Sequence, residues 1–270
     1  MLANNIFLKL ITKTPLITLT TDWGQHDYYM GMLKGRILSN FPQTQIIDLS
    51  HSIPSFNTHS AAFVVRNSFT SFPKGTIHLI LVNTEDNNAT RLIACRHEGH
   101  YFITPDNGIL GLLFSNLPDD IYAVPFDKKD GTFSSLSTFI KAIEQIVNPN
   151  EQAMAEARIT DYSKKVSFKA TIEESTITGS IIYIDSYRNV ITNISKSLFD
   201  RIGQNRKYNI FIQSKHNKIS TLSTRYNQVA PGELLAIFNS ANLLEIAIRN
   251  GYAAELLSLN IGGNVRVNFM

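Results

Sequence analysis

The spacing of apolar residues changes near residue 160, and this change constrains the fold more than any other feature of the sequence. Before it, short apolar runs rich in β-branched residues alternate with stretches of helical spacing, such as Met30, Leu33, Ile37 and Phe41. After it, short β-rich runs are separated by turn residues. The first pattern predicts an α/β domain with a mostly parallel sheet, and the second predicts a small antiparallel sheet or barrel.

The expected elements follow the same division. In the first part we expect strands at 16–20, 45–49, 76–82, 91–96 and 101–104, and helices at 28–41, 61–69 and 136–147, with Asn57 as the N-cap before the second helix. In the second part we expect strands at 166–172, 179–185, 190–194, 208–213, 234–239, 244–248 and 265–269. Because 151–165 is polar and contains no clear strand, we expect a linker there, between domains 1–160 and 161–270.

Composition removes several classes of function. A chain of 270 residues that is 43% hydrophobic can bury a core, and its net charge of +3 comes from scattered Lys and Arg without a basic stripe. The single cysteine, Cys95, excludes an intrachain disulfide and a Cys-rich metal site, and the histidines lack metal-ligand spacing. No apolar run reaches the ~18 residues of a membrane span, and no signal peptide is evident. We therefore expect a cytoplasmic protein with no metal, membrane or nucleic-acid partner.

Two carboxylates lie in the loop after the first expected strand. Asp22 and Asp27 fall where parallel α/β sheets collect ligands, at the carboxyl end of a strand, and together they could hold a diol and an ammonium group. Asp27 could equally cap the helix that begins near Tyr28. The loop has no Gly-rich fingerprint and its acidic residues would repel phosphate, which argues against a phosphate ligand.

Two aromatic residues occupy comparable loops. Phe56 follows the second expected strand and could form a platform for a sugar or a methionine chain, although a Phe before a helix is more often a hydrophobic staple. Tyr187, between two expected strands, could stack on a base whose edge Asn189 would bind. From the residues alone we favour a simple turn for 185–193, and an ordinary turn and helix cap for 105–108.

Six segments occur in an order and rough spacing that resemble the S-adenosylmethionine (SAM) hydroxide adenosyltransferases and the fluorinases and chlorinases. They are TTDWG at 20–24 with Asp27, IDLSHSI at 47–53, FPKGT at 72–76, PDNGIL at 105–110, NVITN at 189–193, and NS at 239–240 with LEIA at 244–247. The resemblance runs from about residue 17 to residue 267. Each segment alone is weak, but six in register are hard to produce by chance.

The resemblance implies an N-terminal α/β domain, a C-terminal antiparallel β-barrel, and a homotrimer that binds SAM between the N-terminal domain of one subunit and the C-terminal domain of the next. It also implies these roles: Asp22 on the ribose hydroxyls, Asp27 and Asp185 on the methionine ammonium, Phe56 packed on the ligand, Tyr187 stacked on adenine, Asn189 on the adenine edge, and Ser240 on the methionine carboxylate. SAM would be the substrate, with no separate cofactor. The reaction would be a displacement at the ribose C5′, with methionine leaving.

The departures from the family pattern fall on the residues that handle water. The hydrolases resembled here orient and activate water with an Asp-Arg-His set, and this chain has Asn83, Arg91 and Ser134 at those positions. An amide cannot take up a proton near neutral pH, so Asn83 could orient water but not activate it. We therefore expect a slow SAM hydrolase. A non-catalytic SAM or adenosine-binding module is the main alternative, and halide transfer, which Ser135 alone would support, ranks below both. Arg188 stands where the family usually has Gly, and it could crowd the adenine pocket or swing outward.

Overall fold

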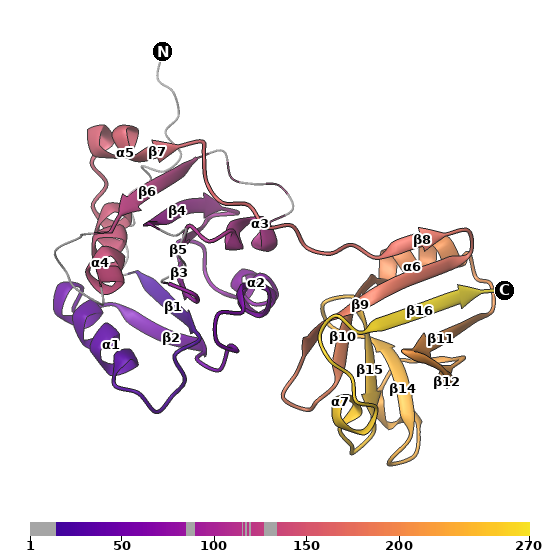
Figure 1. The fold of residues 1–270 in the computed structure, drawn as a ribbon. Helices are drawn as coiled ribbons and strands as arrows, with labels where there is room; N and C mark the ends of the chain where they lie inside the picture. The colour runs from indigo at the N-terminus through magenta and orange to yellow at the C-terminus, as the bar shows by residue number, and fades with distance from the viewer. Residues whose placement is uncertain (1–14, 85–89, 115, 117, 119, 127–133) are drawn as a thin grey trace. The chain divides into compact units, whose positions relative to one another are not determined.

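The computed structural model describes residues 15–84, 90–114, 116, 118, 120–126 and 134–270 (Figure 1). The chain divides into two compact units, one ending at Ser167 and the other running from Phe168 to Met270. Each unit has its own sheet and its own buried core. Among the helices in these described ranges, none has the length and apolar character needed to cross a membrane.

The first unit is built on a mixed sheet with the strand order β2-β1-β3-β5-β4-β6-β7. The strand bounds are β1 Leu16–Thr21, β2 Gln45–Ser50, β3 Ile77–Leu81, β4 Arg91–His97, β5 His100–Pro105, β6 Ile121–Pro125 and β7 Arg158–Ile159. Strands β2, β1, β3 and β5 are parallel to one another, whereas β4 and β7 run against their neighbours. The expectation of a mostly parallel α/β sheet is confirmed.

Helices cover both faces of this sheet. Their bounds are α1 Tyr29–Asn40, α2 Thr58–Arg66, α3 Ile109–Leu113, α4 Ser134–Val147 and α5 Glu151–Ala157, with a 3-10 turn, η2, at Phe69–Ser71. Buried residues of α1, α4 and α5 pack in one cluster, and those of α2 and α3 pack in another on the opposite face. The amphipathic spacing expected for α1 is confirmed, because Met30, Leu33 and Ile37 are all buried in the first cluster.

Local sequence explains where two of these elements lie. Every residue of β3 is buried, as expected for a continuous apolar run in a central parallel strand. Helix α2 begins after Asn57, whose side-chain oxygen accepts a hydrogen bond from the Ser60 N–H at 2.9 Å, so the expected N-cap is confirmed. The helix starts earlier than we expected, and the chain continues through η2 before Pro73.

The polar segment expected to be a linker begins as part of the first unit. Its first half forms α5, capped by Asn150, whose side-chain oxygen accepts a hydrogen bond from the Ala153 N–H at 3.0 Å. Met154 packs into the buried cluster of the first unit, and β7 then adds the edge strand beside β6. One buried residue and a good cap therefore make a helix where overall polarity indicated a linker.

The strand expected at 166–172 is wrong except at its end. Here β8 spans Thr171–Glu173, and the preceding residues have no regular secondary structure. The side chains of Val166 and Phe168 are 76% and 74% exposed. β-propensity alone does not make a strand, because a strand also needs a partner that takes its backbone hydrogen bonds.

The second unit is a near-closed, mostly antiparallel, barrel-shaped sheet with the strand order β12-β11-β16-β9-β10-β15-β14-β13, and β8 pairs with β9. The remaining bounds are β9 Thr176–Ile184, β10 Val190–Ser195, β11 Tyr208–Ile212, β12 Ser214–Ile219, β13 Leu222–Ser223, β14 Leu234–Phe238, β15 Leu243–Ile248, β16 Asn264–Phe269, α6 Lys196–Gly203, α7 Ala253–Leu256 and the 3-10 turn η4 Tyr226–Gln228. Residues from β9, β10, β11, β15 and β16 fill one core. The expected barrel is confirmed.

Candidate functional site

Parallel strands bring several loops to one edge of the first sheet. Strands β1, β2, β3 and β5 point the same way, so the segments that follow them begin at the same edge. This is the edge at which open α/β sheets bind ligands. The predicted residues Asp22, Asp27, Phe56 and Asn83 all lie in these segments.

Asp22 joins three of the loops. Its Oδ2 accepts a hydrogen bond from the backbone N–H of Phe56 at 2.8 Å and another from the backbone N–H of Asn83 at 3.2 Å. A carboxylate that takes two backbone N–H groups fixes the loops after β2 and β3 against the loop after β1. In the described part of the chain, no donor bonds the other oxygen, Oδ1. That oxygen can therefore accept hydroxyl groups of a ligand.

The two residues that donate to Asp22 have unusual backbones. Phe56 has a φ of 64° and Asn83 a φ of 52°, both in the left-handed region that only glycine adopts freely. Asn tolerates this region better than most residues, whereas for an aromatic residue it carries strain. The Phe56 ring is 73% exposed, so the hydrophobic-staple alternative is wrong and the ring is open to a ligand.

Asn107, which follows β5, holds the backbone of the loop after β3. Its side-chain N–H₂ donates to the Val82 carbonyl at 2.9 Å and to the Asn83 carbonyl at 3.2 Å, while its oxygen accepts from the Ile109 N–H at 3.4 Å. The side chain is buried. The segment 105–108, which the residues indicated was an ordinary turn, thus supports the position of Asn83.

Arg91 is engaged by protein groups. Its Nε and one terminal nitrogen lie 2.9 Å from Asp106 Oδ2, and that terminal nitrogen also donates to the Asp161 carbonyl at 2.6 Å. The other oxygen of Asp106 accepts from the Ser163 N–H at 2.8 Å. The guanidinium therefore ties the segment after β7 to the ends of β4 and β5.

Two predicted residues of this unit have few described contacts. Asp27 is exposed, and the N-cap position of α1 is Tyr28, with no side-chain cap bond, so the capping alternative for Asp27 is wrong. Ser134 is the first residue of α4, but its side chain and that of Ser135 lie outside the described residues.

In the second unit, Asp185 and Asn189 hold each other across one tight loop. Asp185 Oδ1 accepts from the Asn189 backbone N–H at 2.8 Å, and its Oδ2 accepts from the Asn189 side chain at 3.2 Å. The backbone closes the same loop, because the Asp185 N–H donates to the Asn189 carbonyl at 3.1 Å. Between them, the side chain of Tyr187 is 74% exposed. The turn expected from the residues is present, and it displays an aromatic ring.

Ser240 lies in the β14–β15 loop and is exposed. The strand register puts Val190 opposite Ile246 and Ser195 opposite Leu243, so this loop and the Asp185 loop flank opposite ends of the β10–β15 pair. Glu245, to which we assigned no role from the sequence, is a buried carboxyl on β15 that contacts the second of these loops through Asn239.

Glu245 is only 3% exposed. It accepts hydrogen bonds from the Tyr226 hydroxyl at 2.8 Å and the Asn239 side chain at 3.1 Å. Burial raises the pKa of Glu245, the negative charge of Asp185 adds to this, and the two hydrogen bonds only partly oppose it. Burial and the bond to Glu245 also raise the pKa of the Tyr226 hydroxyl.

Comparison with protein families assigns both units. The SAM hydroxide adenosyltransferase N-terminal domain matches residues 17–156, and the SAM hydroxide adenosyltransferase C-terminal domain matches residues 179–266. The chain belongs to the SAM hydroxide adenosyltransferase family. The family resemblance seen in the sequence is thereby confirmed.

Individual relatives agree with this family. The chain is 24% identical over 266 residues to an (R)-S-adenosyl-L-methionine hydrolase of Salinispora tropica, covering 95% of this chain and 99% of that protein. A fluorinase of Actinoplanes is a more distant relative, 22% identical over 224 residues, covering 70% of this chain and 74% of the fluorinase. The fold matches a crystal structure of a conserved protein from Thermotoga maritima with a TM-score of 0.78 at 24% identity, covering 94% of this chain and 99% of that one.

The backbone and the side-chain contact of Arg188 bear on the two alternatives stated for this residue. Arg188 has a φ of 61°, in the left-handed region that glycine adopts most freely. Its Nε lies 3.2 Å from Glu255 Oε1, and both side chains are more than half exposed. Of the two alternatives for Arg188, this contact supports a side chain that extends outward along α7.

Proposed function

We propose that this chain binds SAM and hydrolyses it slowly to adenosine and L-methionine. The observation that carries the proposal is the arrangement of Asp22, which is fixed by two backbone N–H groups while none of the described residues bonds its other oxygen, at the sheet edge where α/β proteins bind ligands. A fixed carboxylate oxygen is suited to a ribose hydroxyl. The relatives named as (R)-SAM hydrolases support the same reaction.

The proposed reaction is a displacement at the ribose C5′. The water oxygen forms a bond to C5′ as the C5′–S bond breaks, and the electron pair of that bond goes to sulfur. Methionine leaves as a neutral thioether, and the attacking water loses one proton, which passes to solvent water because the Asn83 amide cannot take it up. Because the leaving group needs no proton, the site has to position the ligand and the water and exclude other water.

We further propose the following contacts for SAM: Asp22 with the ribose hydroxyls, Asp27 and Asp185 with the methionine ammonium, Phe56 with the ligand chain, Tyr187 with the adenine face, Asn189 with the adenine edge, and Ser240 with the methionine carboxylate. Phe56 and Tyr187 are both exposed, which supports the proposal that their rings contact the ligand. In a homotrimer the two sets of residues would come from neighbouring subunits. Light scattering tests this, and a monomer that binds SAM tightly would contradict it.

A non-catalytic SAM or adenosine-binding module is the second candidate. Its support is that the water-handling residues are compromised, since Asn83 cannot accept a proton and the Arg91 guanidinium is taken up by Asp106 and the Asp161 carbonyl. Slow hydrolysis and no hydrolysis differ only in the rate of adenosine release.

Adenosine release from SAM separates the two candidates. The purified protein is incubated with SAM, and adenosine is quantified by chromatography against a protein-free control and against Asp22→Ala. Adenosine above both controls supports the hydrolase, whereas tight SAM binding without adenosine supports the binding module. Parallel incubations with fluoride or chloride would reveal a 5′-halogenated nucleoside if halide were the nucleophile.

A further inference from the structure

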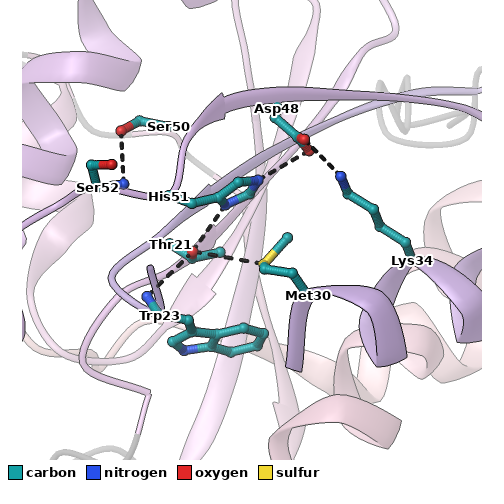
Figure 2. A network of polar contacts seen from close by, with 8 residues as sticks. All are labelled: Thr21, Trp23, Met30, Lys34, Asp48, Ser50, His51 and Ser52. Atoms are coloured by element: carbon teal, nitrogen blue, oxygen red, sulfur yellow. Dashed lines mark hydrogen bonds and ion pairs between the residues drawn. The ribbon is translucent and has the colours of Figure 1, made fainter. Parts of the chain in front are cut away.

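A chain of polar contacts runs from the surface of the first unit to the start of the Asp22 loop (Figure 2). Thr21 Oγ1 lies 3.0 Å from His51 Nδ1, and His51 Nε2 lies 3.1 Å from Asp48 Oδ1. The other oxygen of Asp48 bonds Lys34 Nζ at 2.6 Å. Thr21 and His51 are buried, while Asp48 and Lys34 are partly exposed.

The two ring nitrogens of His51 make different kinds of contact. Nδ1 shares a hydrogen bond with the Thr21 hydroxyl, and which of the two donates depends on the His51 tautomer. Nε2 makes an electrostatic contact with Asp48 that lacks the angle of a hydrogen bond. The Thr21 oxygen also accepts from the Trp23 N–H at 3.4 Å. Burial works against the charge of Asp48, but the contacts with Lys34 and His51 outweigh burial and lower the pKa of the Asp48 carboxyl. The carboxylate that orients His51 is therefore ionised at neutral pH.

His51 is bonded to residues on both sides of Asp22. Its side chain contacts Thr21, which precedes Asp22, and its backbone carbonyl accepts the Gly24 N–H at 2.9 Å. The Asp22 backbone is thus held at both ends by a single buried residue of the next loop. The direction in which the Asp22 carboxylate points depends on this short segment.

A second Thr–His pair in the same unit has the same chemistry but a different place. Thr18 Oγ1 lies 2.7 Å from His78 Nδ1, and His78 Nε2 lies 3.3 Å from His100 Nδ1. Burial and the neighbouring His100 lower the pKa of His78 to about 3. This pair lies among core aromatic rings such as Phe69, within the strands, and has no described bond to residues 22–24.

We propose that His51 is a positioning residue for Asp22, acting through Thr21 and Gly24 and oriented by the Asp48–Lys34 ion pair. The proposal rests on the proposed function, because it assigns Asp22 to the ribose of SAM or adenosine. His51 itself contacts neither the ligand nor the reacting atoms. The SAM hydroxide adenosyltransferase site would then depend on a fixed orientation of Asp22 as well as on its charge.

The test is a double-mutant cycle read out as the adenosine dissociation constant by calorimetry. His51→Phe keeps much of the volume but removes the ring nitrogens, and it should weaken binding about 10-fold, the value of one or two hydrogen bonds. In an Asp22→Asn background the same change should weaken binding by about twofold or less, because the oriented charge is already gone. A purely structural loss would give the same factor in both backgrounds.

Two threonines on β1 provide a matched control that does not depend on His51→Phe folding. Thr21→Val and Thr18→Val remove the same hydroxyl from two equally buried positions that each contact a histidine Nδ1. Both should lower the unfolding midpoint. Only Thr21→Val should also weaken adenosine binding, by about 3- to 10-fold, and speed amide hydrogen exchange at Phe56, whose N–H bonds Asp22.

The outcomes separate this role from the proposed function. If wild type binds adenosine, but Thr21→Val and Thr18→Val change its affinity equally or His51→Phe acts equally in both Asp22 backgrounds, the positioning role is wrong and the function stands. If wild type binds neither adenosine nor SAM, the proposed function fails and the role falls with it. Coupling confined to the His51–Thr21–Asp22 set supports the role.

Discussion

The two units hold their candidate ligand residues in opposite ways. In the first unit, Asp22 bonds the backbone of Phe56, 34 residues away, and of Asn83, 61 residues away. In the barrel, Asp185 bonds Asn189, which is only four residues away. The first arrangement exists only when three strands have paired in the correct order, whereas the second needs little more than one tight turn. The candidate residues of the first unit thus depend on the pairing of the sheet, whereas those of the second unit depend on one hairpin.

The two units also treat a carboxyl side chain differently. Asp48 sits at the edge strand β2, where Lys34 and His51 lower its pKa despite partial burial. Glu245 is buried, receives only neutral hydrogen-bond donors in the described part of the chain, and has a raised pKa.

The largest change in rate is expected at Asn83, whose amide side chain cannot accept a proton from water. Asn83→Asp with Ser134→His introduces the residues that the family resemblance implies at these positions, and the adenosine-forming rate should rise by ~10²–10⁴-fold, the usual contribution of an acid–base group. Because Asp22 and Asn107 bond the Asn83 backbone, and Asp tolerates a φ near 52° almost as well as Asn, the new carboxylate should take up the Asn83 position.

Single-turnover measurements with saturating SAM check this prediction, and the SAM dissociation constant serves as the control. If the double variant binds SAM as wild type does and shows no gain in rate, the alignment of these residues with the family set is wrong. A wild type as fast as the double variant would mean that the two substitutions do not impair catalysis.

The second prediction separates the proposed ligand binding by Asp22 from its hydrogen bonds to the backbone of Phe56 and Asn83. Asp22→Asn should weaken adenosine binding about 10- to 150-fold, since charge-assisted bonds are worth roughly 1.5–3 kcal/mol, yet keep the unfolding midpoint near that of wild type. Its amide oxygen can still accept the Phe56 and Asn83 N–H groups. Asp22→Ala should lose binding and also ~0.5–1.5 kcal/mol of stability per lost bond, because neither backbone N–H keeps its protein acceptor.

Calorimetry and thermal melting of the two Asp22 variants decide this prediction. Equal stability of the Asn and Ala variants would mean that the two backbone bonds do not hold the loops together. An unchanged adenosine dissociation constant in Asp22→Asn would remove Asp22 from the site.

The third prediction concerns Asp185, which is held in the tight loop before β10. Asp185→Asn keeps an oxygen that can accept the Asn189 N–H but removes the charge, so SAM affinity should fall about 10-fold while adenosine, which has no ammonium, binds within about twofold of wild type. The amide exchange of the first unit should not change. Equal losses for SAM and adenosine would instead place Asp185 at the nucleoside.

The contrast between local and long-range contacts also explains what could be predicted from the sequence. Apolar spacing was sufficient to predict β1, α1, β3 and, in the barrel, β9, β10, β11, β14, β15 and β16, because these patterns depend on burial on one or both faces. The N-cap at Asn57 and the turn before Asn189 could be predicted because their partners lie a few residues away. Helix α5 was missed, since one buried residue, Met154, is too little for a periodic signal.

The supporting residues of the first site could not be predicted in the same way. Asp106 and Asn107 have the composition of a simple turn, and only the completed sheet brings them to Arg91 and to the carbonyl of Asn83. His51 contacts Thr21 across two neighbouring parallel strands, a contact set by register and not by sequence spacing. A histidine directly after a strand and three residues after an aspartate was the signal available.

The fourth and smallest effect is a difference in pH dependence between the two carboxyls. The raised pKa of Glu245 means that its contribution to stability is present below the unfolded value of about 4.3 and is lost as pH rises through the folded value. The lowered pKa of Asp48 acts in reverse: its contribution is present above about 3.9 and is lost as pH falls through the folded value.

Denaturant unfolding at several pH values, with each variant compared with wild type, measures both effects. Glu245→Gln should become more stable relative to wild type as pH rises from about 4 to neutral, because wild type alone must then ionise a buried carboxyl that faces Asp185. Asp48→Asn should be less stable than wild type at neutral pH, and the gap should close on acidification below about 4. The Asp48 effect should be the smaller, because its carboxyl is 41% exposed and water screens its ion pair. If both variants shifted in the same direction with pH, the opposite electrostatic settings of the two units would be wrong, and with them the role of the Asp48 carboxylate in orienting His51.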